Sequence, residues 1–91
     1  MATPSATFTK GTEERLDYDI DYTFVLTNGD TIASSAWDAP VAMDDGQSNS
    51  SKVSKIWLKD GTIGVTYAVT NTMTSVLGRV FVRTFLLRII A

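Results

Sequence analysis

The sequence predicts a small all-β protein in which antiparallel strands form two packed sheets. Three features support this prediction. The 91 residues suffice for one domain with a single core, and 44% of them are hydrophobic. Runs of alternating apolar and polar residues show the two-residue period of strands, and no helical period competes with it. Turn signals such as Asn28-Gly29 and Asp60-Gly61 separate these runs.

The first residues do not share this pattern. Residues 1–12 are small and polar without a period, so we expect a flexible N-terminal tail followed by the domain at residues 13–91. An arm that becomes ordered on a partner is the alternative. The sequence start does not resemble a signal peptide, and no apolar run approaches the roughly 20 residues of a membrane span. We therefore expect synthesis in a cytoplasm and no membrane partner.

Composition excludes several kinds of chemistry. The chain has no cysteine and no histidine, which rules out disulfides, thiolate metal sites, imidazole catalysis and histidine-bound zinc. Its net charge of −2 divides into −7 over residues 1–45 (two bases, nine acids) and +5 over residues 46–91 (six bases, one acid). The two halves should attract each other, within one molecule or between copies. The bases are spread over several strands, so we expect no nucleic-acid partner.

Two strands are expected in the first half. Residues 16–22 alternate strictly, with aspartates on the face opposite Leu16, Tyr18 and Ile20. Residues 23–26 break the alternation, and a helical turn there would place Leu26 in the core. Residues 30–37 form the second expected strand, with Ile32 inward. Trp37 has the opposite parity, so it is either exposed or turned inward by a bulge.

The middle of the chain alternates between short elements and loops. We expect a short strand at residues 41–43 and a long polar loop at residues 44–51. Residues 53–59 return to extended structure. Their parity places Ile56 and Leu58 inward and Trp57 outward.

The last third should contain two long strands. In the strand that begins at Thr66, one face carries Tyr67, Val69, Asn71 and Met73. In the strand at residues 80–90 the core positions are Phe85, Leu87 and Ile89. The run Val80-Phe81-Val82 places apolar side chains on both faces of its strand, whereas a strand with one solvent-exposed face should carry polar residues on that face. Either another part of this chain or another molecule covers it.

One spacing refines the fold class. Tyr67 follows Gly64 by three residues and precedes Val69 by two, which places Val69 where an immunoglobulin domain has its second cysteine. The Tyr67 hydroxyl would then bond to backbone near Asp60 or Gly61 as a tyrosine corner. We therefore predict an immunoglobulin-like, fibronectin type III-like sandwich of about seven antiparallel strands.

Several segments, in order along residues 16–90, resemble one known family. They are Leu16-Asp17-Tyr18-Asp19-Ile20-Asp21-Tyr22, Leu26, Gly29-Asp30-Thr31-Ile32, Ser34-Ser35-Ala36-Trp37, Ile56-Trp57-Leu58, residues 60–71, and Gly78-Arg79 before an apolar terminal strand. Together they are similar to the small immunoglobulin-like proteins of tailed bacteriophages and prophages described as phage fiber-tail adaptors. The resemblance implies a structural component of the virion tail, made in the bacterial cytoplasm, that joins fibers to the tail body without catalysis. The family tends to be polar after the Gly-Arg pair, whereas this chain has Val80-Phe81-Val82.

Contact with other tail or fiber proteins, or with further copies in the particle, would then be the main activity. Aromatic and apolar side chains beside arginines are enriched at protein interfaces. The candidate interface residues are Trp57, Val80, Phe81, Val82, Trp37, Arg79 and Arg83. The alternative is that a bulge turns Trp37 inward and a strand covers Phe81. Arg79 would in turn pair with Asp30 or Asp60 inside the domain.

Other functions find less support. The spacing of Asp17, Asp19 and Asp21 resembles the start of a calcium loop, but Tyr22 and Asn28 occupy the positions where that loop requires glycine and a carboxylate. No pair of carboxylates is placed for glycoside cleavage, so we predict neither a metal, a cofactor nor an enzyme. The alternative function is a carbohydrate-binding module that recognises a host surface through Trp37, Trp57 and residues 44–51.

Overall fold

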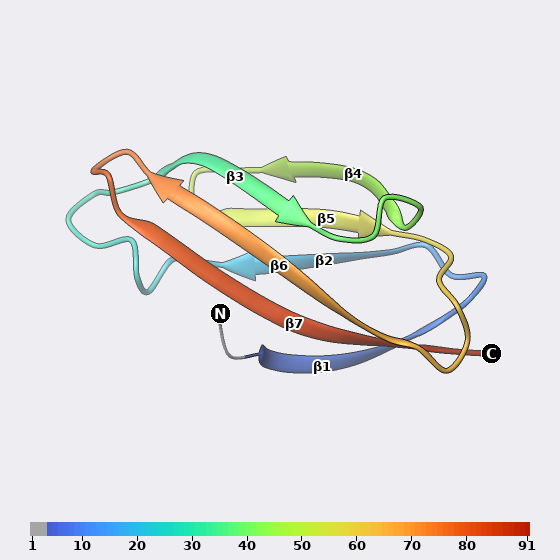
Figure 1. The fold of residues 1–91 in the computed structure, drawn as a ribbon. Helices are drawn as coiled ribbons and strands as arrows, with labels where there is room; N and C mark the ends of the chain where they lie inside the picture. Colours follow the sequence, from blue (N-terminus) through green and yellow to red (C-terminus); the bar gives the residue numbers. More distant parts are fainter. Residues whose placement is uncertain (1–3) are drawn as a thin grey trace.

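The structure is a computed structural model that describes residues 4–91, and it confirms the all-β prediction: two β-sheets pack face to face (Figure 1). One sheet has the strand order β1-β7-β6-β3 and the other the order β2-β5-β4. The strands are β1 (Pro4–Gly11), β2 (Leu16–Asp21), β3 (Ile32–Asp38), β4 (Asp44–Asn49), β5 (Val53–Leu58), β6 (Thr66–Ser75) and β7 (Val80–Ile90).

Strand directions differ from the prediction at one place. β1 pairs in parallel with β7, whereas the other four pairings are antiparallel. The orders β2-β5-β4 and β7-β6-β3 are compatible with those of the corresponding strands of an immunoglobulin constant-type domain. In the immunoglobulin domain, however, the first and second strands lie in the same sheet. In this structure β1 lies beside β7, in the sheet opposite β2. The immunoglobulin-like assignment itself stays a prediction.

The expected flexible tail is wrong for Pro4–Gly11, which forms β1; residues 1–3 lie outside the described residues. Ala6 and Phe8 face the other sheet, and Lys10 is only 1% exposed. The Lys10 ammonium donates to the carbonyl oxygens of Gly11 at 2.8 Å and Asp60 at 2.7 Å. The sequence pattern does not predict this strand, because a small alanine and a charged lysine flank Phe8 on its inward face and leave no apolar alternation.

The core between the sheets follows the predicted parity in β5, β6 and β7. Its main cluster contains Trp37, Met43, Ile56, Leu58, Val69, Phe85, Leu87 and Ile89. A second cluster at one end contains Tyr22, Leu26, Ile32 and Met73. Leu26 is 3% exposed, because a turn in which the amides of Val25 and Leu26 donate to the Tyr22 carbonyl oxygen directs it inward.

Trp37 belongs to this core, which resolves the open question of its orientation. The register of β3 against β6 shifts between Ile32 and Ser34, and this bulge brings both Ile32 and Trp37 to the inner face. The Trp37 side chain is 8% exposed and its ring meets that of Phe85 edge-on at 6.1 Å. Trp37 is therefore not a surface contact residue.

The segment between β3 and β5 corrects two further predictions. Residues 41–43 form a turn, not a strand, in which the amides of Met43 and Asp44 donate to the Pro40 carbonyl oxygen at 2.9 and 3.1 Å. Residues 44–49 form β4, not a loop. β4 is an edge strand whose backbone pairs with β5, so it needs no apolar alternation of its own.

A buried polar network joins the two sheets near the second cluster. Asn71 is fully buried, and its side-chain amide donates to the hydroxyls of Ser35 at 2.8 Å and Ser54 at 3.2 Å. Its carbonyl accepts from the Tyr22 hydroxyl at 2.7 Å. Burial raises the pKa of Tyr22 to about 12. The hydrogen bonds of Asn71 thus connect strands β3, β5 and β6 with the end of β2.

Tyr67 fastens the turn before β6. Its hydroxyl accepts a hydrogen bond from the Thr62 backbone amide at 3.1 Å, one residue beyond the expected Asp60 or Gly61. Gly64, at φ +84°, donates its amide to the Ile89 carbonyl oxygen at 2.8 Å. The turn is therefore held both to β6 and to β7.

Candidate docking surface

The residues predicted to form an interface do not form one common surface. Val80 and Val82 lie on the outer face of the β1-β7-β6-β3 sheet, where they are 61% and 38% exposed. Phe81 has the opposite direction and packs against Tyr22 with ring centroids 6.2 Å apart. The Arg83 guanidinium carbon lies 5.6 Å from the centre of the Phe81 ring. Of the doubly apolar run, only the two valines face solvent.

Trp57 lies on the other sheet, on its outer face. The guanidinium carbon of Arg15 lies over the Trp57 ring at 4.3 Å from its centre, and the Lys55 ammonium lies at 5.9 Å. With Trp37 in the core and Trp57 beneath Arg15, neither tryptophan presents the open ring face that carbohydrate binding would require. No observation therefore favours the carbohydrate alternative.

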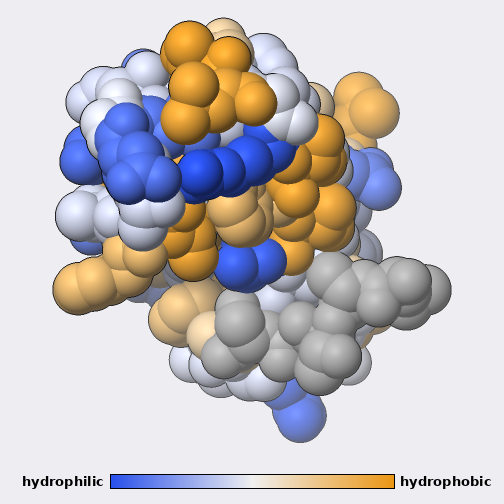
Figure 2. Space-filling model, turned by 90° about the vertical axis from the view of Figure 1, so that its left-hand side faces the viewer, coloured by the Kyte–Doolittle hydropathy of each residue, from blue (hydrophilic) through white to orange (hydrophobic). Residues whose placement is uncertain are grey.

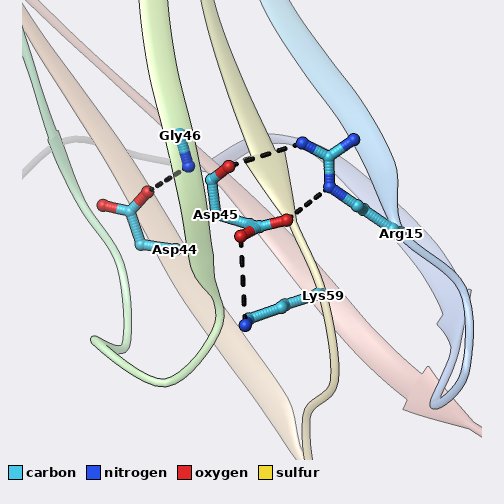
Figure 3. Close-up of polar contacts among 5 residues, drawn as sticks. All are labelled: Arg15, Asp44, Asp45, Gly46 and Lys59. Carbon is cyan, nitrogen blue, oxygen red and sulfur yellow. Dashed lines mark hydrogen bonds and ion pairs between the residues drawn. The ribbon is translucent and has the colours of Figure 1, made fainter.

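Ion pairs cover the outer face around Trp57. Asp45 lies between Arg15 and Lys59, with its carboxylate bonded to the Arg15 side chain and 3.9 Å from the Lys59 ammonium (Figure 3). The Arg15 side chain is the main cause of the lowered pKa of Asp45, and the charge of Lys59 contributes. Lys55 pairs with Asp17 at 3.2 Å. The attraction expected between the acidic and basic halves is thus present within one molecule.

A different surface carries four of the large apolar side chains that are exposed to solvent. The end of the sandwich formed by residues 22–31 and the β6–β7 turn carries Phe24, Val76, Leu77 and Val80, which are 92%, 64%, 58% and 61% exposed. We call these four residues the loop-end surface. Figure 2 views this end and shows apolar side chains in separate groups with charged and polar ones between them. Such a mixture is common at protein interfaces.

A buried carboxylate holds these loops in place. Asp30 is 1% exposed, and its Oδ1 atom accepts from the backbone amides of Leu77 at 3.1 Å and Thr31 at 3.0 Å. Its Oδ2 atom lies 3.8 Å from the Arg79 guanidinium, so Arg79 pairs with Asp30, one of the two partners considered. The Val76 amide also donates to the Thr31 carbonyl oxygen at 2.9 Å. Val76 and Leu77 therefore stand on a fixed turn.

The charge of Asp30 makes this turn sensitive to acid. Desolvation opposes ionisation, but hydrogen bonds from Ser75, Leu77 and Thr31 and the charge of Arg79 outweigh it and lower the pKa below 3.8. Asp30 thus contributes stability that is present above its unfolded pKa and is lost as pH falls through its lower folded pKa.

We expect the Leu77 amide to lose hydrogen-exchange protection, measured by NMR, as pH falls through the lowered pKa of Asp30. Core amides of β6 serve as the control for global unfolding. Asp30→Asn should make the protection of Leu77 nearly independent of pH in this range. Protection that persists in acid in the wild-type protein would contradict the role of the carboxylate.

Sequence reasoning missed most of the loop-end surface. Phe24 lies in the segment for which a helical turn is predicted, and Val76 and Leu77 lie between the two long strands predicted for the last third of the chain. Two adjacent large apolar residues in a turn are unusual, because turns favour small and polar residues. That signal could have marked the site.

The fold places this chain among small all-β sandwich domains. A family model described as podophage GP4 fiber-tail adaptor protein gp77 matches residues 10–88. The chain belongs to this family of structural tail adaptors, which makes it a phage tail component.

Comparison with solved structures shows the fold alone. A crystal structure of a 2,6-sialyltransferase from the Vibrionaceae bacterium Photobacterium sp., with CMP and lactose bound, matches 98% of this chain at a TM-score of 0.57 and 10% identity. This chain spans only 18% of that enzyme. No curated protein sequence gives a significant match. Within residues 4–91, no helix is long and apolar enough to cross a membrane.

Proposed function

We propose that this protein is a non-enzymatic adaptor of the virion tail that binds other tail or fiber proteins through the loop-end surface. The observation that carries the proposal is the exposure of four large apolar side chains at one end of the sandwich, where a buried carboxylate fixes the β6–β7 turn. Membership of the adaptor family supports the same class of function.

The energetics of docking favour this surface. Burial of apolar area contributes about 25 cal/mol per Å², and Phe24, Val76, Leu77 and Val80 all have most of their side-chain area still to bury. Because Asp30 and Arg79 already order the β6–β7 turn, binding would lose little additional conformational entropy there. Arg79 also donates to the Thr27 hydroxyl at 3.1 Å, which ties the two loops together.

Charge substitutions at the loop-end surface should weaken partner binding. We expect Leu77→Asp and Phe24→Asp each to raise the Kd for a tail or fiber protein of the same genome at least tenfold, because a carboxylate would be buried without a partner. Size-exclusion chromatography with light scattering would identify the binding partner, and calorimetry would give the Kd. Both side chains are largely exposed, so the melting temperature should change little.

Val41→Asp is the matched control, since Val41 is 94% exposed in the β3–β4 connection, at the opposite end of the sandwich (Figure 1). It should leave the Kd for this partner unchanged. Equal binding by all three variants would refute the proposed surface, and equal loss in all three would show a non-specific effect of added charge.

A further inference from the structure

A groove opens along the side of the sandwich where β1 and β2 lie in different sheets. It has a volume of about 500 Å³ and is lined by Ala6, Phe8, Asp17, Tyr18, Asp19, Ile20 and Phe85. The rings of Phe8, Tyr18 and Phe85 form its floor, with centroids 5.2 to 5.5 Å apart. Phe8 remains 42% exposed, and the Tyr18 hydroxyl has no hydrogen-bond partner among the described residues. The groove is therefore an apolar surface with an acidic side.

The backbone on the acidic side is available for pairing. Within residues 4–91, β2 is an edge strand whose single partner is β5. The Tyr22 amide donates to the Lys52 carbonyl oxygen at 2.8 Å, and hydrogen-bonded positions alternate along an antiparallel pair. Ile20 and Tyr18 consequently bond to β5, whereas the N–H and C=O groups of Asp17 and Asp19 point away from it, toward the free edge.

The negative charge of the β2 aspartates limits which segments can pair with the free edge of β2. Asp17, Asp19 and Asp21 project from the outer face of β2, next to the position of any added strand. A second copy pairing through its own β2 would set aspartates against aspartates, and like charges on neighbouring strands are destabilising. A segment with basic residues on that face would instead be attracted. Its alternate residues would point over the Phe8 and Tyr18 rings, where apolar side chains fit.

We propose that the free edge of β2 accepts an extended protein segment that alternates apolar and basic residues, which adds as a strand over the groove. The backbone of Asp17 and Asp19 supplies hydrogen bonds, their carboxylates attract the basic side chains, and the aromatic floor receives the apolar ones. The inference rests on the proposed adaptor function, in which this segment belongs to a neighbouring tail or fiber protein.

A blocked nine-residue peptide that alternates valine and lysine is a direct probe. NMR of the isotope-labelled protein should show shifted and more slowly exchanging amides at Asp17 and Asp19. A peptide that alternates valine and glutamate should bind at least tenfold more weakly. Equal binding of the two peptides, chemical-shift changes confined to the loop-end surface, or no binding at millimolar peptide would overturn the proposal.

Asp19→Pro tests the backbone contact. Proline is tolerated on an edge strand where the N–H faces solvent, so the variant should keep its fold while the lysine peptide binds at least tenfold more weakly. Asp38→Asn, an exposed carboxylate on β3, is the control and should bind like wild type. Unchanged peptide binding by Asp19→Pro would exclude strand addition.

The proposal for the groove and the proposal for the loop-end surface can be refuted independently. If the peptide does not bind but Leu77→Asp abolishes partner binding, the groove proposal falls and the adaptor function stands. If the peptide binds at β2 while Leu77→Asp has no effect on the partner, the loop-end surface is wrong and the strand site remains.

Discussion

Replacing Asn71 with leucine is expected to lower the free energy of unfolding by about 2–5 kcal/mol, because it leaves buried polar groups without partners. Asn71 is fully buried and bonds to the hydroxyls of Tyr22, Ser35 and Ser54. Leucine has a similar volume, so the loss comes from hydrogen bonds more than from a cavity. Chemical denaturation followed by tryptophan fluorescence would measure it, since Trp37 lies in the core.

A double-mutant cycle separates the network from general packing. Tyr22→Phe removes the hydroxyl that donates to Asn71, so Asn71→Leu should cost less in that background than in the wild type. The Ser35 and Ser54 hydroxyls remain close enough to bond to each other. Strictly additive effects of the two substitutions would contradict the hydrogen bond between Tyr22 and Asn71.

Phe85→Ala is expected to cost about 3–5 kcal/mol, the range for truncation of a buried phenylalanine. Phe85 is 3% exposed and its ring meets those of Phe8, Tyr18 and Trp37 at 5.5, 5.2 and 6.1 Å. It thus connects β1 and β2 to the centre of the core. The loss should appear both in denaturation and in faster amide exchange of β1.

Phe85→Leu is the appropriate control, because it keeps an apolar side chain and leaves a smaller cavity. It should cost clearly less than Phe85→Ala and preserve the protection of β1 amides. If β1 exchanged equally fast in the wild type and in both variants, the role of Phe85 in anchoring β1 would be wrong.

The sequence predicted those strands whose apolar residues alternate against a single core. In β2, β5, β6 and β7 large side chains occupy most of the alternating inward positions, so pattern and structure agree. β1 and β4 lack this signal. Lys10 reaches the backbone carbonyl oxygens of Gly11 and Asp60 from inside the sandwich, a contact that depends on residues 50 positions apart.

The candidate site was less predictable because it depends on tertiary arrangement. One extra residue in β3 moves Trp37 from one face to the other, and parity counted along the sequence cannot detect such a bulge. Trp57 has the expected direction but Arg15, 42 positions before it in the sequence, covers its ring. Only the fold brings residues 22–31 and the β6–β7 turn to the same end.

The parallel pairing of β1 with β7 also has a mechanical consequence. The two terminal strands run side by side in the same direction over the partners Pro4–Gly11 and Thr84–Ile90. Tension applied between the N-terminus and the C-terminus would pull these strands past each other along their length. The inter-strand hydrogen bonds would then bear the load together in shear instead of opening one after another. The sandwich should therefore resist rupture under tension applied at its two termini.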